Sequence, residues 1–199
     1  MSAPDITELD RRAVQGSVAV VSAVTNGDLT RATPCAEWTL GELLAHMTVQ
    51  HDGFAAAAAG RGADADIWTV RPVGADPVRE YAAAADRVLA AFSEPGVLER
   101  RFALPEITSA MTFPGVQAIS FHLIDYVVHG WDVARSLGVP YQVDDDLAKV
   151  ALQVAELVPG GERRLIPGAA FAPVLTAPQD ADTLDRTLLI LGRSPAWPD

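Results

Sequence analysis

Four ionisable side chains interrupt an otherwise apolar stretch of this sequence. The segment FHLIDYVVHGWD, residues 121–132, carries His122, Asp125, His129 and Asp132 at steps of three, four and three. In a helix that turns about 100° per residue, they fall within roughly 80° of one another. Burying four such groups together costs free energy unless they pair or bind something. The spacing therefore predicts a polar stripe with a chemical role.

The central pair of this stripe has the spacing of a metal site. Asp125 and His129 are separated by one helical turn, so their side chains point at a common spot. One carboxylate and one imidazole on a single face are a usual start for a divalent-metal site inside a helical bundle. Such a site takes its remaining ligands from a facing helix.

The segment TLGELLAHMTVQHDGF, residues 39–54, offers two further histidines. His46 lies at the edge of its apolar face, whereas His51 points about 140° away from His46. Both cannot be ligands on one straight helix, and His46 is favoured. The predicted metal ligands are therefore His46, Asp125 and His129. Two imidazoles and one carboxylate leave open positions for water or substrate and suit Zn²⁺ best, with Ni²⁺ or Fe²⁺ as alternatives.

The outer members of the stripe have plainer interpretations. His122 either supports a ligand from behind or lies at the rim of the site. Asp132 caps the helix, pairs with Arg135, or orients a ligand imidazole. In a purely structural alternative, the whole stripe satisfies itself with hydrogen bonds. Cys35 is interpreted as a buried residue that packs the loop before the second helix.

Helical periodicity dominates the elements that must position these residues. Thr39 followed by Glu42 is a capping box, and Asp76 followed by Pro77 is another helix start. Residues 96–113 are expected to be extended or a hairpin. The fold class is mainly all-α, a four-helix bundle over residues 1–158 with a small cap over residues 159–199, packed as a single domain. The predicted helices are 5–25, 40–59, 77–93, 114–137, 145–158 and 182–191.

Composition limits the class of partner. The chain has 199 residues, 49% of them hydrophobic, and a net charge of −11. Nucleic-acid binding needs a basic footprint, so it is not expected. With one cysteine there is no internal disulfide, which fits a reducing cytoplasm. No signal peptide or transmembrane run is apparent, so we expect a cytoplasmic protein without a membrane partner.

Three motifs resemble one known family. TPCAEWTLGELLAHM, residues 33–47, resembles the second-helix signature of the DinB-like, mycothiol-dependent maleylpyruvate isomerase-type proteins. DYVVHGWDVARSLG, residues 125–138, resembles their other ligand-bearing helix. FAPVLTAPQDADTLDRTLLILGRSPAW, residues 171–197, resembles the ending of a short actinobacterial subgroup about as long as this chain. The resemblance spans nearly the whole sequence.

This resemblance implies a DinB-type four-helix bundle whose metal ligands fall on His46, Asp125 and His129. Asp125 stands where the isomerase type carries a Glu. The isomerase also has a larger C-terminal domain than residues 159–199 can form, so its substrate-binding residues are not transferred. Mycothiol is implied as a thiol co-substrate of an isomerase or S-transferase, acting on an electrophilic small molecule. A metal-dependent hydrolase and a non-catalytic metal-binding or ligand-sensing bundle stay open, and a homodimer is expected.

Overall fold

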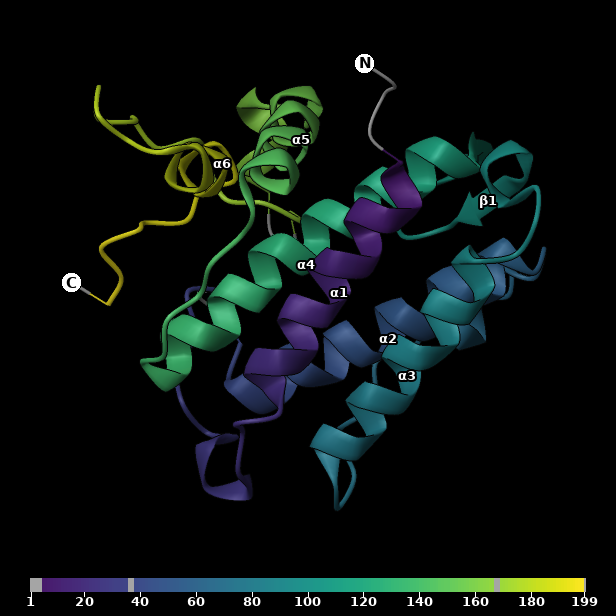
Figure 1. The fold of residues 1–199 in the computed structure, drawn as a ribbon, viewed down its shortest axis with the longest axis horizontal. Coiled ribbons are helices and arrows are strands. Elements are labelled where there is room, and N and C mark those ends of the chain that lie inside the picture. Colours follow the sequence, from purple (N-terminus) through teal and green to yellow (C-terminus); the bar gives the residue numbers. More distant parts are fainter. Residues whose placement is uncertain (1–4, 36–37, 167–168, 199) are drawn as a thin grey trace.

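The computed structural model describes residues 5–35, 38–166 and 169–198, with the side chain of Arg163 left aside. Within these residues the protein is mainly helical, as predicted. Helix α1 packs along α4 and α2 along α3, so that four long helices form the bundle (Figure 1). The elements are α1 (Ile6–Val21), α2 (Leu40–Ala58), α3 (Pro77–Phe92), β1 (Arg101–Leu104), β2 (Thr108–Pro114), α4 (Gly115–Leu137), α5 (Asp145–Leu157) and α6 (Thr183–Ile190).

The predicted capping box fixes the start of α2. The Thr39 hydroxyl accepts a hydrogen bond from the Glu42 amide at 3.3 Å, and the Glu42 carboxylate accepts one from the Thr39 amide at 2.8 Å. Two of the donors that a helix start leaves without partners are thereby satisfied. Because the first turn is fixed, the direction in which His46 leaves the helix is fixed as well.

The first helix is shorter than predicted. It ends at Val21 instead of continuing to residue 25. Thr25 instead starts a short turn of its own, since its amide donates to the Asp28 carboxylate at 2.9 Å. Thr and Asp side chains that bond to nearby backbone compete with helix formation, which explains the early stop.

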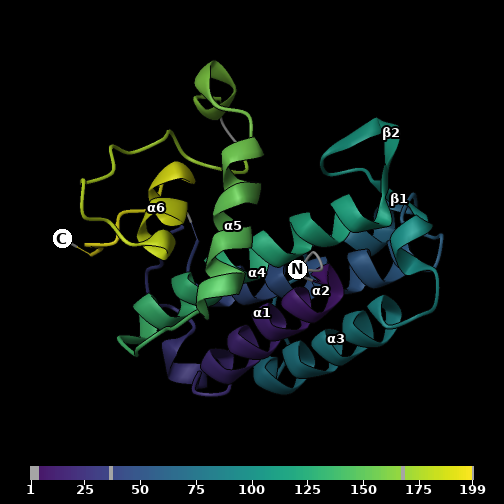
Figure 2. The ribbon, with the colours of Figure 1, turned by 45° about the horizontal axis from the view of Figure 1, so that its top comes forward.

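The expected hairpin is present between α3 and α4. Strands β1 and β2 pair antiparallel, with Phe102 opposite Phe113 and both rings buried. The hairpin stands at the N-terminal end of α4 (Figure 2). At its turn, Glu106 accepts a hydrogen bond from the side-chain amide of Gln50 on α2. The hairpin is therefore tied to the helix that carries His46.

The C-terminal part of the chain packs against the bundle. Helices α5 and α6 lie together beside α4 (Figure 2). Leu188 and Leu191 belong to the same apolar cluster as the buried residues of α1, α2 and α4. After α6, the chain is held to α4 by Arg135, which donates to the carbonyls of Pro195, at 3.1 Å, and Trp197. None of the described helices is long and apolar enough to cross a membrane.

Candidate metal centre

The three residues singled out as ligands lie together between two helices. Helix α2 supplies His46, and α4 supplies Asp125 and His129. One donor atom from each lies within 4.8 Å of the other two, and His129 Nε2 is 3.3 Å from Asp125 Oδ1. We call this group, which is the candidate site for a metal ion, the metal cluster. Its two imidazoles and one carboxylate are the donors that a zinc-type cation takes in proteins, so the residues present fit such an ion.

The charges of the metal cluster also suit a cation. Burial lowers the pKa of His46 to about 4, which leaves its lone pair free at neutral pH. Burial alone would raise the pKa of Asp125, but the His129 imidazole beside it outweighs burial and holds it at about 2. Burial likewise opposes the charging of His129, but Asp125 and then Asp132 raise its pKa to about 10. The metal cluster thus favours one positive charge. A bound cation would supply that charge in place of the second proton of the His129 imidazole.

Asp132 bonds to the other nitrogen of His129. Its Oδ2 lies 2.9 Å from His129 Nδ1, and the carboxylate has no exposed surface. A carboxylate behind a ligand imidazole fixes the ring and its tautomer, leaving Nε2 to the metal. Of the roles considered for Asp132, the geometry matches the orientation of a ligand imidazole. It does not pair with Arg135, whose side chain holds the C-terminal segment instead.

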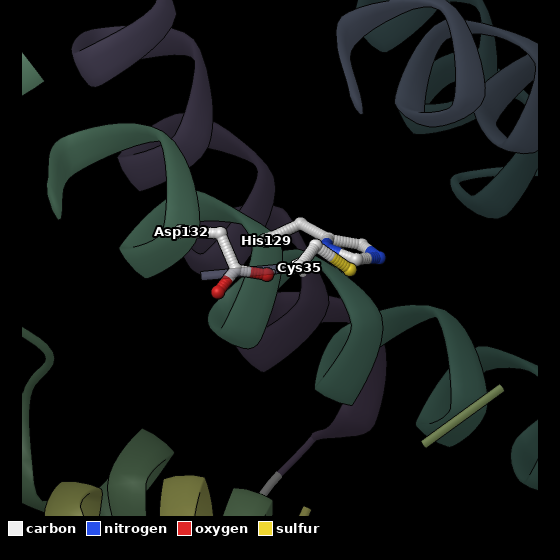
Figure 3. A group of neighbouring side chains, drawn as sticks. All are labelled: Cys35, His129 and Asp132. Carbon is white, nitrogen blue, oxygen red and sulfur yellow. Dashed lines mark hydrogen bonds and ion pairs between the residues drawn. The ribbon is translucent and has the colours of Figure 1, made fainter. Parts of the chain in front are cut away.

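A second group of possible ligands, Cys35, His129 and Asp132, shares His129 with the first group. Figure 3 shows the side chains of this second group. This second group already has a cationic partner in the protein, the side chain of Arg193. The guanidinium of Arg193, which is 4% exposed, lies 3.3 Å from Asp132 Oδ2 and 3.4 Å from Cys35 Sγ. A metal ion there would be repelled by the arginine. The thiol is half-buried, and burial raises its pKa, so the sulfur is a weak nucleophile.

His122 does not join the metal cluster. Its Nδ1 lies 2.7 Å from Asp10 Oδ1 on α1, and its Nε2 lies 3.1 Å from His51 Nδ1 on α2. Both ring nitrogens are therefore occupied, and none is left to support a ligand. All three side chains are completely buried, and we call them the core cluster. His122 lies on the same face of α4 as His129, but it belongs to a separate cluster, because α1 supplies a carboxylate beside it.

The metal cluster has an open side. The Asp125 side chain is 24% exposed, and the indole of Trp38 lies against the His46 ring with 4.6 Å between centroids. Trp38 thus forms a wall of the site. A hollow of about 360 Å³ lies between α2 and the segment 66–73, lined in part by Ala45 and Val49, but none of the three candidate ligands lines it. The open side of the metal cluster is therefore the partly exposed Asp125 itself.

Two residues of the site were missed at the level of sequence. Arg193 is 61 residues away from Asp132 in the chain, and no local spacing links them. The sequence feature that could have indicated Arg193 is the LGRSPAW motif, residues 191–197, in which this arginine follows shortly after the end of α6. Glu106 sits in the turn of the hairpin, where burial and then the nearby Asp125 raise its carboxyl pKa. Only the folded chain brings that turn near Asp125.

Comparison with known proteins places the chain in a family. The sequence model of the mycothiol maleylpyruvate isomerase N-terminal domain matches residues 11–134, a span that includes all three predicted ligands. The chain belongs to this family. The suspected relationship, drawn from the motifs around His46 and His129, is therefore confirmed.

Relatives agree in length and fold. Two Mycobacterium tuberculosis proteins, both described as uncharacterized, are each 29% identical over 185 residues, which is 92% of this chain and 95% of theirs. The crystal structure of a mutant mycothiol-dependent maleylpyruvate isomerase has a TM-score of 0.57 at 13% identity. A second structure of that isomerase has a TM-score of 0.52 at 15% identity. Each match covers 75% of this chain but only 66% of the isomerase, so the likeness concerns the fold.

Proposed function

We propose that this family member binds one divalent cation, Zn²⁺ in the first place, through His46, Asp125 and His129. The observation that carries the proposal is the geometry of the metal cluster, in which three donors of the right kind lie within 4.8 Å of one another. Its partly exposed Asp125 leaves a side for an incoming molecule. Ni²⁺ and Fe²⁺ use the same donors, and the test distinguishes them.

We further propose that the protein is an enzyme that uses a small-molecule thiol, with mycothiol favoured by family membership. When bound, a divalent cation lowers the pKa of a coordinated thiol and so supplies a thiolate at neutral pH. The chain's own residues hold the site: Asp132 keeps the His129 proton on Nδ1, and Trp38 shields the ligand rings. The protein's own thiol is unsuited, because Cys35 contacts Arg193 and burial raises its pKa.

The proposed reaction class is thiol addition to an electrophilic small molecule, as in an isomerase or S-transferase. The substrate is not transferred from the isomerase, because this chain matches only 66% of that protein's length. Metal-assisted hydrolysis and ligand sensing without catalysis would use the same open side of the metal cluster. The thiol experiment below distinguishes them from the thiol-dependent reaction.

The first experiment is metal content by plasma mass spectrometry. Wild type is compared with His46→Ala and His129→Ala, and with His51→Gln as a matched control on the same helix. We expect about one equivalent of metal in wild type and the control, and almost none in the two alanine variants, since each loses one of three ligands. A wild type that holds no metal after dialysis against Zn²⁺, Ni²⁺ and Fe²⁺ would refute the metal centre.

The second experiment addresses the thiol. Co²⁺-substituted protein is titrated with mycothiol, and a sulfur-to-cobalt charge-transfer band is followed. We expect the band in wild type and its loss in His46→Ala. If the metal binds but no thiol band forms, the thiol-dependent enzyme is wrong, and hydrolysis or sensing takes its place.

A further inference from the structure

The LGRSPAW segment, residues 191–197, reaches the metal cluster from the far end of the chain. Helix α6 ends at Ile190, and Gly192 follows its C-cap with a φ of 79°, a backbone conformation that suits glycine. An added Cβ there would lie only 2.6 Å from the side chain of Ala172. The Arg193 amide then bonds back to the Leu188 carbonyl at 2.9 Å. This tight turn directs the next side chain toward α4.

The Arg193 side chain is fixed on several sides. Nη1 donates to the Leu191 carbonyl at 3.1 Å, and the guanidinium lies 5.7 Å from the ring centre of Phe171. Among the described residues its acidic partner is Asp132, at 3.3 Å. Burying an arginine is costly unless it is paired, so the ion pair with Asp132 stabilises the guanidinium in this position.

Arg193 and His129 share one oxygen. Asp132 Oδ2 accepts from His129 Nδ1 at 2.9 Å and from Arg193 Nη2 at 3.3 Å. Because the guanidinium donates to the oxygen that accepts from the imidazole, it fixes the position of that oxygen and, with it, the plane of the His129 ring.

We propose that Arg193 is a positioning residue of the metal centre, acting through Asp132 to direct His129 Nε2 at the metal. The C-terminal segment is then part of the site and does more than cover the bundle. This inference rests on the proposed metal binding by His46, Asp125 and His129. Groups that orient a metal ligand from behind typically change metal affinity by about 10- to 100-fold.

The chain contains a matched control for docking. Arg135 holds the same segment through the carbonyls of Pro195 and Trp197. It has no hydrogen bond or ion pair with Asp132 among the described residues. Replacing Arg135 loosens the segment without removing the partner of Asp132, whereas replacing Arg193 does both.

The test measures Zn²⁺ affinity by competition with a chelating dye, together with the thermal midpoint of the metal-free protein. Arg193→Met is expected to bind Zn²⁺ about 10- to 100-fold more weakly than wild type. Arg135→Met should lower the midpoint but leave the affinity unchanged. Arg193→Lys keeps the charge and should recover part of the loss. In an Asp132→Asn background, the Arg193→Lys substitution should have no further effect, because the shared carboxylate is gone.

Two results would overturn the inference. One is a wild-type affinity for Zn²⁺ in a folded Arg193→Met protein. If that variant does not fold, the corresponding result is a wild-type affinity for Zn²⁺ in Arg193→Lys, with no coupling between Arg193→Lys and Asp132→Asn. The other is an equal loss of affinity in Arg135→Met, which would mean that docking of the segment alone matters. A wild type that binds no Zn²⁺ would instead remove the metal centre itself, so the two failures are distinguishable.

Discussion

Helix α4 carries two histidine clusters of nearly the same composition and opposite character. His129 meets His46 from α2 and a carboxylate, Asp125; two turns earlier, His122 meets His51 from α2 and a carboxylate, Asp10. In the core cluster the two imidazoles bond directly to each other at 3.1 Å. In the metal cluster the rings meet edge to face with 5.3 Å between centroids. Only the second arrangement leaves donor atoms converging on a common point.

The source of the carboxylate explains much of this difference. Asp10 comes from α1, which lies over α4 and seals the core cluster from solvent. Asp125 comes from α4 itself and stays partly exposed. Burial, the largest influence in each case, raises the pKa of Asp10 and lowers that of His51 well below 6.5. At Asp125 in the metal cluster, the neighbouring His129 imidazole outweighs burial, and the pKa of that carboxyl is lowered. Identical residue types therefore produce either a hydrogen-bonded core or a group of converging donor atoms, depending on what covers them.

Breaking the core cluster should have the largest effect on stability. His122→Ala leaves the Asp10 carboxylate buried without its partner and opens a cavity. We expect the free energy of unfolding to fall by about 3–5 kcal/mol. Chemical denaturation of metal-free protein measures this loss, and mass spectrometry of the folded variant should still find the metal. Loss of metal from a folded His122→Ala protein would show that the two clusters are not independent.

Adding metal should stabilise the protein through one cluster only. At a free Zn²⁺ concentration 100 times the Kd, binding to the native state adds about 2.7 kcal/mol. We expect this gain in wild type and in His51→Gln, and none in His46→Ala. Thermal unfolding at several Zn²⁺ concentrations measures it. An equal gain in His46→Ala would place the ion elsewhere on the protein.

Acid should weaken the core cluster. His51 is neutral in the fold, with a pKa lowered by burial and then by His122, while the unfolded chain takes up a proton below about 6.5. Its contribution is therefore present above pH 6.5 and is lost as the pH falls toward the folded-state value. One such proton amounts to about 1.4 kcal/mol per pH unit.

The matched variant for this pH dependence is His51→Gln, whose amide can still form a hydrogen bond with His122 but cannot be protonated. Urea unfolding at pH 7, 6 and 5 should show the metal-free wild type losing stability faster than the variant. Asp10 has a raised pKa and opposes this trend, but it is present in both proteins. Parallel pH curves for the two proteins would mean that His51 does not titrate as inferred.

The sequence was most informative where spacing within one helix decides the geometry. Asp125 and His129 are one turn apart, and the Thr39 capping box sets the phase of α2, so His46 could be assigned as the facing histidine. The hairpin and the ends of most helices followed from turn chemistry in the same way. These features depend on neighbours within a few residues, which a single sequence displays.

Contacts between distant segments were not predictable in this way. His122 is on the same face as His129, and only the path of α1 assigns it to Asp10, 112 residues away in the chain. Arg193 reaches Asp132 across 61 residues through a turn at Gly192. In both cases tertiary packing determines the partner. The periodicity of one helix does not predict which other segment packs against it.

The smallest predicted effect concerns α2, the helix that supplies a histidine to each of the two clusters. Thr39→Ala removes the hydroxyl that accepts from the Glu42 amide and donates to its carboxylate, at 2.7 Å, at the start of α2. Loss of such a cap costs about 1 kcal/mol. His46 lies nearer this end than His51, and the core cluster is held by direct bonds to α1 and α4. Fraying should therefore weaken Zn²⁺ affinity slightly while leaving the His51 contribution to pH-dependent stability unchanged. Hydrogen exchange of the first turn of α2 and dye competition for Zn²⁺ measure the two effects, with Thr48→Ala on the same helix as the control. An unchanged exchange rate would mean that Trp38 and the preceding loop hold the end of α2 without the cap.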